Sequence, residues 1–358
     1  MKDQNQRSGF ATALPLVINA RVTAFATGGQ QRVAAEIMLR IPDAVQVMPA
    51  KPLGGIKGHA WEQVVLPFKT GGRLLWSPSA TGPLLYRHQV VTVHDTAFFD
   101  VPEYFAPSFV RLYQALVPRL AHRVARVVTV SEFSRRQIAD RTGLVPDRID
   151  VIYNGVAAEF RPYAPDFINA TRAALKLPQR YLLVQATADR RKNLARTLDA
   201  WRMIAGEVSE DVHLVVAGNL ARAHVFGTSD LNLVAPRLHV TGYVADEHMG
   251  PLMAGADALV FASLYEGFGL PVIEAMAAGT PVITGNNSAL PEVAGDAALL
   301  VDAGSTEAIA GAMRSIILER GLAQALAERG LERARRFTWE SAAQQYIRLF
   351  RELSPQKA

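Results

Sequence analysis

Short apolar runs alternate along the chain with longer segments in which apolar residues recur every three or four positions. Apolar runs bounded by turn residues indicate buried strands, and the longer spacing indicates amphipathic helices. In the first half, strands are predicted at residues 14–18, 74–76, 90–93, 127–130 and 149–152. In the second half, strands are predicted at residues 181–184, 212–217, 238–241, 258–261, 281–284 and 298–301.

The segments between these strands have the helical spacing, as in Leu194, Leu198, Trp201 and Ile204. Regular alternation of strand and helix predicts an α/β fold in which helices cover parallel sheets. A chain of 358 residues is long for one core and suits two domains. Ligands in such doubly wound sheets bind at the carboxyl ends of the strands.

A linker is predicted at residues 160–165, where two prolines favour extended chain. We therefore expect one Rossmann-like domain over residues 1–163 and a second over residues 164–338, facing each other across a cleft. The last amphipathic segment, residues 339–353, is a candidate to pack back on the first domain.

The formal net charge of +5 indicates an anionic partner such as a nucleotide, a lipid surface or a nucleic acid. Six arginines stand against one acid between positions 111 and 136. Aromatic residues are not interleaved with them as in a base-stacking platform, so nucleic acid is not the expected partner. The chain has no cysteine, no apolar leader and no run long enough to span a bilayer. These features predict a cytoplasmic protein, with peripheral contact at the inner face of the plasma membrane as an added expectation.

The most informative segment follows the strand at residues 258–261 and reads Ser-Leu-Tyr-Glu-Gly-Phe-Gly-Leu-Pro-Val-Ile-Glu from Ser263 to Glu274. Pro271 suits the first position of a helix, and Gly279 suits the position just past its end. A glycine turn that opens a helix exposes backbone N–H groups where a diphosphate binds favourably. Carboxylates beside such a site, Glu266 and Glu274, are best used to accept hydrogen bonds from sugar and ribose hydroxyls.

Glu266 and Glu274 resemble the E-x7-E signature of the retaining glycosyltransferases of family 4, and the later Ser288-Ala289-Leu290-Pro291-Glu292-Val293 strengthens the resemblance. The resemblance implies a B-type fold of two Rossmann-like domains. It implies that Glu266 holds hydroxyls of the transferred sugar and that Glu274 holds the ribose. It places backbone N–H groups of Phe268, Gly269 and Leu270 near the sugar and phosphates.

A second resemblance lies at Arg190-Arg191-Lys192-Asn193, which is similar to the Pro-Arg-Lys-Asn step of the family. It implies that Arg191 and Lys192 neutralise the diphosphate leaving group, whose charge grows in the transition state. The chain departs from the family at Ala186, where glycine is usual, and at Arg190, where proline is common. The alternative is a solvated basic helix start, which would oppose the helix dipole.

The remaining expected site residues lie at strand ends. Gly28 and Gly29 resemble the glycine loop that lines the donor phosphates, and His94 matches the active-site histidine of the family. Tyr243 and Val244 would lie beside the nucleotide base. Each of these residues also has a purely structural reading, and Ser131 in particular could be a plain helix N-cap.

The resemblance implies retention of configuration and no cofactor beyond the nucleotide-sugar co-substrate. No Asp-x-Asp triplet occurs in the sequence, so no metal site is expected. The segment from His94 to Ser134 resembles bacterial mannosyltransferases of polysaccharide or O-antigen assembly, which implies GDP-mannose as donor and a saccharide or polyprenyl-diphosphate-linked acceptor. A UDP- or dTDP-sugar donor, a non-hydrolysing UDP-sugar 2-epimerase and a non-enzymatic binding module stay open as alternatives.

Overall fold

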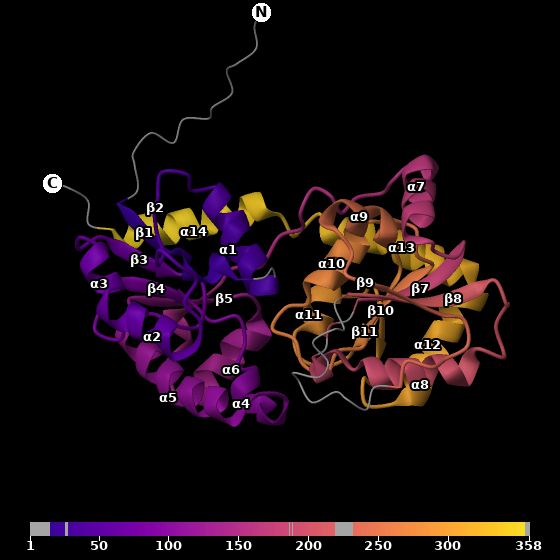
Figure 1. Ribbon diagram of the computed structural model, residues 1–358, viewed down its shortest axis with the longest axis horizontal. Helices are drawn as coiled ribbons and strands as arrows, with labels where there is room; N and C mark the ends of the chain where they lie inside the picture. The colour runs from indigo at the N-terminus through magenta and orange to yellow at the C-terminus, as the bar shows by residue number, and fades with distance from the viewer. Residues whose placement is uncertain (1–14, 26–27, 186, 188, 219–231, 355–358) are drawn as a thin grey trace, which may run out of the picture. The chain divides into compact units, whose positions relative to one another are not determined.

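The computed structural model describes residues 15–25, 28–185, 187, 189–218 and 232–354, and within them the strands form two six-stranded sheets (Figure 1). The first sheet has the order β2-β1-β3-β4-β5-β6. Its strands are β1 (Leu16–Asn19), β2 (Val45–Val47), β3 (Leu74–Ser77), β4 (Gln89–Thr92), β5 (Arg126–Thr129) and β6 (Ile149–Val151). The sequence missed β2, a three-residue edge strand with two exposed side chains and hence no buried apolar run.

The second sheet has the order β12-β11-β10-β7-β8-β9, with every neighbouring pair parallel. Its strands are β7 (Arg180–Gln185), β8 (Val212–Ala217), β9 (Leu238–Gly242), β10 (Ala258–Phe261), β11 (Val282–Gly285) and β12 (Leu299–Val301). The order reverses between β7 and β10, so their connections leave in opposite directions. Such a switch point leaves a crevice at the carboxyl ends of the two strands, where ligands of doubly wound sheets bind.

Helices connect the strands in both halves of the chain. In the first half they are α1 (Gly29–Leu39), α2 (Gly55–Val64), α3 (Leu66–Lys69), α4 (Ala97–Asp100), α5 (Pro107–Arg123) and α6 (Glu132–Thr142). In the second half they are α7 (Pro165–Leu175), α8 (Leu194–Ile204), α9 (Asp246–Ala254), α10 (Leu270–Ala277), α11 (Leu290–Ala294), α12 (Thr306–Leu318), α13 (Arg320–Ala334) and α14 (Trp339–Leu353). Together with the two sheets they make the α/β fold that the sequence predicted.

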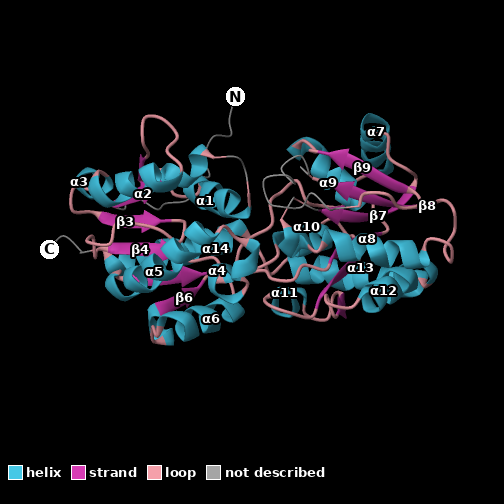
Figure 2. Cartoon of the chain, turned by 60° about the horizontal axis from the view of Figure 1, so that its bottom comes forward, coloured by secondary structure: helices cyan, strands magenta, loops and turns pink. Residues whose placement is uncertain are grey.

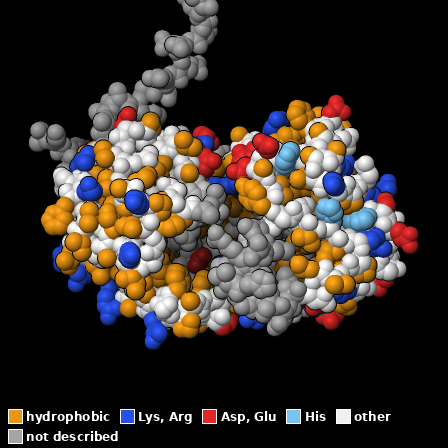
Figure 3. Space-filling view, in the orientation of Figure 1, with side chains coloured by type: hydrophobic (Ala, Val, Ile, Leu, Met, Phe, Trp, Pro, Cys, Tyr) orange, Lys and Arg blue, Asp and Glu red, His pale blue; other side chains and the backbone are white. Residues whose placement is uncertain are grey.

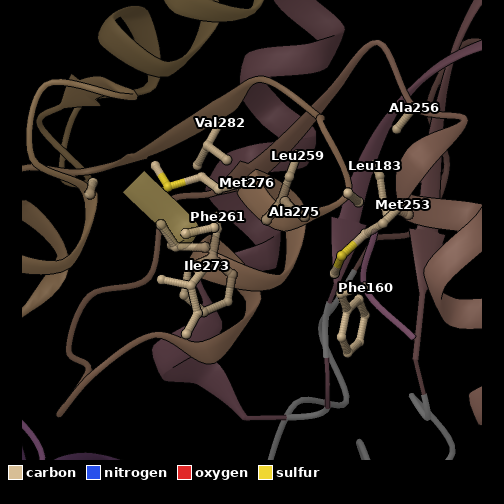
Figure 4. Close-up of a cluster of buried hydrophobic side chains, with 14 of the residues drawn as sticks. Phe160, Leu183, Met253, Ala256, Leu259, Phe261, Ile273, Ala275, Met276 and Val282 are labelled. Carbon is tan, nitrogen blue, oxygen red and sulfur yellow. The ribbon is translucent and has the colours of Figure 1, made fainter. Parts of the chain in front are cut away.

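Two apolar layers cover the second sheet. On one face, α8 and α12 bury their apolar sides against alternate residues of β7, β8 and β10, with Trp201 fully buried among them. On the other face, residues from α9, α10 and α11 pack against the residues between, as Figure 4 shows for Met253, Ile273 and Phe261. The two pairs α9–α10 and α8–α12 lie on opposite sides of the strands in Figure 1. A sheet buried on both faces explains why its strands are continuously apolar.

The contact pattern separates the chain into two compact units. One contains residues 1–92, 119–127 and 343–358, and the other contains residues 93–118 and 128–342. In the first unit, the end of α14 packs against β3 and β4: the ring of Tyr346 lies 5.1 Å from that of Trp76, and its hydroxyl lies 3.1 Å from Thr92 Oγ1. The described helices include none that is long and apolar enough to cross a membrane.

Candidate functional site

The segment after β7 carries the two cations expected at the site. Residues Arg190–Lys192 form a short 3₁₀ turn, and Asn193 follows in the left-handed conformation at a φ of 56°. The buried Asn193 amide donates hydrogen bonds to the carbonyl oxygens of Ala262, at 3.0 Å, and Ala303, at 2.7 Å. Asn193 therefore fixes this turn against the segment that leaves the neighbouring strand β10.

The segment after β10 brings a carboxylate to the same place. Lys192 Nζ donates to Glu266 Oε1 over 2.6 Å and lies 4.9 Å from the centre of the Phe261 ring. Ser263 Oγ lies 2.7 Å from the same Glu266 oxygen and 2.9 Å from the Arg191 carbonyl oxygen. One cation and one carboxylate thus meet at the switch point between β7 and β10, and Ser263 holds the carboxylate in place.

Arg191 is surrounded by negative charge. Its Nε donates to Asp189 Oδ2 at 3.0 Å, and its guanidinium lies 4.9 Å from the centre of the Phe105 ring. Burial acts to lower the pKa of Arg191, but the hydrogen bonds to Asp189 and the charges of Asp95 and Glu266 outweigh it and raise that pKa. Arg191 therefore remains a full positive charge beside Lys192.

The glycine turn leads into α10 as expected, with one difference. Gly269 caps the helix at a φ of 96°, so Leu270 is the first helical residue and Pro271 the second rather than the first. Gly279 follows the end of the helix at a φ of 79°, which confirms its predicted position. Glycine is needed at both positions because other residues rarely adopt such φ values.

Two expected site residues of this segment have buried side chains. Glu274 lies on α10 with 3% of its surface exposed. Phe268 belongs to the core, and its ring lies 5.7 Å from that of Phe337. The Phe268 side chain is therefore part of the core, and the ligand contact that the resemblance implies for this residue uses its backbone N–H group.

His94 lies directly against the glycine turn. A Cβ atom at Gly267 would approach the His94 carbonyl oxygen to 2.3 Å. Ser131 Oγ accepts from Ser134 N at 3.0 Å, as an N-cap, and donates to the Gly267 carbonyl oxygen at 2.7 Å. Ser131 therefore does both things: it caps α6 and ties that helix to the turn beside His94.

A hydrogen-bonded network also joins the segment that follows His94 to Tyr265, which comes two residues before Gly267. The Tyr265 hydroxyl donates to Asp100 Oδ2 at 2.7 Å and lies 3.0 Å from Thr96 Oγ1. Asp100 Oδ1 in turn accepts from Arg141 Nε at 2.7 Å. Burial and the neighbouring Asp100 and Asp95 raise the pKa of Tyr265, so its hydroxyl stays a donor at neutral pH.

Gly267→Ala tests this close approach. We expect the free energy of unfolding to fall by about 1–3 kcal/mol, the usual cost of overpacking, because the added methyl group meets the backbone of His94. Thermal unfolding measures the change. Gly311→Ala in α12 is the control, since nothing lies within 4 Å of its added Cβ and alanine favours helix. Equal melting temperatures for Gly267→Ala and wild type would contradict the tight packing.

The remaining expected residues lie outside these segments. Tyr243 follows β9 and is 73% exposed, whereas the Val244 side chain is buried in the core. Gly28 caps α1 and Gly29 is its first residue, and both belong to the unit that begins the chain. The expected departure at Ala186 lies outside the described residues.

Several residues that organise the site were not predicted from the sequence. Ser263, Asp189 and Asn193 stood inside or beside the quoted motifs, but their polar side chains gave no sign of their partners. The pairing of Asp100 with Tyr265 joins residues 165 positions apart, which no local pattern reveals. Among the described residues, no three His, Cys, Asp or Glu side chains gather where they could hold a metal ion.

Comparison with known sequences gives matches over both halves of the chain. The family described as glycosyl transferases group 1 matches residues 168–333, and glycosyltransferase family 4 matches residues 74–160. O-antigen chain mannosyltransferase B of Escherichia coli is 30% identical over 265 residues, which cover 73% of this chain and 70% of that protein. O-antigen chain mannosyltransferase RfbU of Salmonella typhimurium is 28% identical over 72% of this chain and 68% of that protein.

Solved structures show the same fold. HepE from Anabaena, in complex with UDP and glucose, has a TM-score of 0.74 and 18% identity over 94% of this chain and 99% of that chain. WaaG, a glycosyltransferase involved in lipopolysaccharide biosynthesis, has a TM-score of 0.71 and 17% identity over 94% of this chain and 99% of that chain. The motifs around Lys192 and Glu266, the two-sheet architecture and these matches agree, and the chain belongs to the glycosyltransferases of group 1 and family 4, with their B-type fold.

Proposed function

We propose that this glycosyltransferase is a retaining hexosyltransferase that moves mannose from GDP-mannose to a lipid-linked saccharide or polysaccharide precursor. The observation that carries the proposal is the contact of Lys192 with Glu266 at the switch point of the second sheet. The names of the two relatives, both O-antigen mannosyltransferases, support mannose as the sugar and a saccharide as the acceptor. Family membership favours transfer over the epimerase and the non-enzymatic binding module.

The leaving group is the part of the reaction that Arg191 and Lys192 serve. As the bond between the sugar C1 and the diphosphate breaks, negative charge grows on the phosphate oxygens. Preorganised cations stabilise such charge most where water is excluded. Asp189 and Glu266 pair with these cations, so a bound diphosphate would compete with the two carboxylates for them.

We assign the two glutamates to the hydroxyl groups of the donor sugar and of the ribose. A carboxylate accepts hydrogen bonds from hydroxyl groups and can stabilise positive charge developing on the sugar ring. Glu266 lies beside Lys192, where the sugar next to the diphosphate would lie, and Glu274 is the fifth residue of α10, where we assign it to the ribose. Among the residues that the structure describes, no side chain stands out as a nucleophile. The preferred mechanism is therefore front-face attack, in which the donor phosphate accepts the proton of the acceptor.

The proposal also includes the setting of the reaction. The enzyme would act in the cytoplasm with no cofactor beyond the nucleotide sugar, and a polyprenyl-diphosphate-linked acceptor would bring it to a membrane surface.

The test is product analysis with GDP-mannose and a mannose-ended acceptor in excess EDTA. We expect transfer to proceed, because no described side chains gather as metal ligands. NMR should show an α linkage, because a retaining enzyme keeps the α configuration of GDP-mannose in the product. UDP-glucose and dTDP-glucose in parallel reactions serve as controls for the donor. Transfer from those donors alone would replace GDP-mannose, a β product would exclude retention, and loss of activity in EDTA would exclude the metal-free route.

A further inference from the structure

The helices α2 and α3 carry an exposed apolar stripe. Ile56, Ala60, Val64 and Phe68 follow one another at intervals of four residues, and all four are exposed. The exposed fractions are 85% for Ile56, 63% for Val64 and 86% for Phe68. Residues four apart lie on one side of a helix, so Ile56, Ala60 and Val64 share the outward face of α2. Phe68 continues the row on α3, which begins two residues after α2 ends. Single exposed apolar residues are ordinary, but a row of them marks an interaction site.

The loop before β4 extends this surface. Gln63 donates to the Gly82 carbonyl oxygen at 2.7 Å and accepts from Leu84 N at 2.9 Å. These bonds hold against α2 the loop that contains Leu85, whose side chain is 85% exposed. Beneath the helices, Leu66 packs against Val17 of β1 and Leu75 of β3, so the surface stands on the core, and Figure 2 shows α2 and α3 beside β3. We call Ile56, Ala60, Val64, Phe68 and Leu85 the α2–α3 face.

The chain segment that carries the α2–α3 face is rich in basic residues. Between positions 44 and 94 the only acidic residue is Glu62, which is buried and paired with Arg21 at 3.0 Å. Burial acts to raise the pKa of Glu62, but His59, Arg21 and Asn19 outweigh it and lower that pKa, so its charge is balanced inside the protein. The exposed charged residues of this stretch are Lys51, Lys57, Lys69 and Arg87. On the face in Figure 3, Lys and Arg side chains stand among hydrophobic ones over this part of the chain.

The arginine-rich segment between positions 111 and 136 differs from the α2–α3 face in its exposed side chains. Between residues 109 and 136, Leu112 is the one large apolar side chain that is exposed, at 39%. Arg135 is paired with Glu132 at 3.0 Å, and Arg126 is half-buried. That segment offers positive charge without an apolar surface, whereas the α2–α3 face offers both.

We propose that the α2–α3 face docks on an anionic lipid bilayer. Side chains of Ile56, Val64, Phe68 and Leu85 enter the boundary between headgroups and acyl chains, and the four exposed cations of the same chain segment pair with the headgroups. Interfacial helices bind in this way, with the apolar face buried about 5–10 Å deep and strength set by apolar area plus charge. The inference adds to the proposed function the surface of the protein that meets the membrane, and it does not depend on which donor the enzyme uses.

Vesicle binding of the full-length protein tests the proposal, with phosphatidylglycerol vesicles compared with phosphatidylcholine vesicles. We expect co-sedimentation with the anionic vesicles that falls steeply with salt, since the screening length shrinks from about 10 Å at 0.1 M to about 3 Å at 1 M. Trp61 of α2 gives a local signal, because it is half-buried while the other tryptophans, Trp76, Trp201 and Trp339, are fully buried. Brominated lipids should quench its emission, and Trp61→Phe should remove that signal without loss of co-sedimentation.

Two double variants separate the apolar and charged parts. Ile56→Ser with Phe68→Ser should lower the partition constant by at least about tenfold, because two exposed apolar side chains no longer enter the lipid. Lys57→Gln with Lys69→Gln should lower it by about 25-fold at low salt, about fivefold per cation. The matched control is Phe167→Ser with Leu318→Ser, which removes two apolar side chains, each 60% exposed, from α7 and α12. All the altered side chains are exposed, so melting temperatures should stay close to that of the wild type.

Three outcomes would overturn the proposal. The first is no binding of the wild type to anionic vesicles at low salt. The second is loss of binding in Arg111→Gln with Arg123→Gln while Ile56→Ser with Phe68→Ser binds as the wild type does, which would place the lipid contact on α5. The third is a dimer in solution that Phe68→Ser dissociates while vesicle binding is unchanged, which would make the face a contact between copies of this chain.

Discussion

Lys192→Ala should lower kcat by about 10²-fold or more, on the scale of losing one electrostatic partner of the transition state. The ammonium group of Lys192 lies at the switch point of the second sheet and is held there by Glu266 at 2.6 Å. Arg191→Ala should have an effect of the same size, because its guanidinium is fixed by Asp189 and remains charged. Steady-state kinetics with GDP-mannose measures both.

The control for this pair is Arg190→Ala. Arg190 is the neighbouring cation but is exposed, so its removal should change kcat by less than about threefold, as expected of a screened surface charge. The variants also differ in what they leave behind: Lys192→Ala leaves the Glu266 carboxylate without its cation and should weaken GDP binding as well. Wild-type turnover in both Lys192→Ala and Arg191→Ala would refute the assignment of these residues to the leaving group.

The sheets and the strand ends could be predicted from the sequence because burial on both faces leaves an unbroken apolar run. All the predicted strands are present, and the run at residues 258–261 coincides with β10. Once strands are placed, parallel topology brings their carboxyl ends to one edge, so the approach of Lys192 to Glu266 follows from two separate motifs. The edge strand β2 lacked that run, because two of its three side chains are exposed and the third is half-buried.

The support of the site could not be predicted in the same way. Asn193 and Ser263 act through carbonyl oxygens of distant residues, and a carbonyl has no signature in the sequence. Ser131 is an example. The sequence allowed two roles for it, a helix N-cap or a site residue, and the structure shows that one hydroxyl caps α6 and also donates to the Gly267 carbonyl oxygen. Local patterns fix local geometry, whereas pairings across the fold depend on how the elements pack.

Glu266→Gln should lower kcat by about 10²-fold while leaving the affinity for GDP nearly unchanged, a loss of about 2.7 kcal/mol confined to the transition state. The amide keeps the size of the side chain and can still bind Ser263, but it removes the charge that faces the sugar. It also releases Lys192 from its ion pair, so any change in GDP affinity should be toward tighter binding. A lower GDP affinity with wild-type kcat would mean that Glu266 serves the nucleotide instead.

Glu274→Gln is the matched experiment on the other glutamate, and it should give the opposite pattern. Losing hydrogen bonds from a charged acceptor to ribose hydroxyls should weaken GDP binding by about 1–3 kcal/mol, measured by calorimetry, with a smaller effect on kcat once the donor is saturating. Because Glu274 is 3% exposed, glutamine is preferred to alanine, which would leave a cavity in α10, and thermal unfolding checks that the fold is kept. If Glu274→Gln lowered kcat at saturating donor and Glu266→Gln weakened GDP, the two glutamates would have to exchange roles.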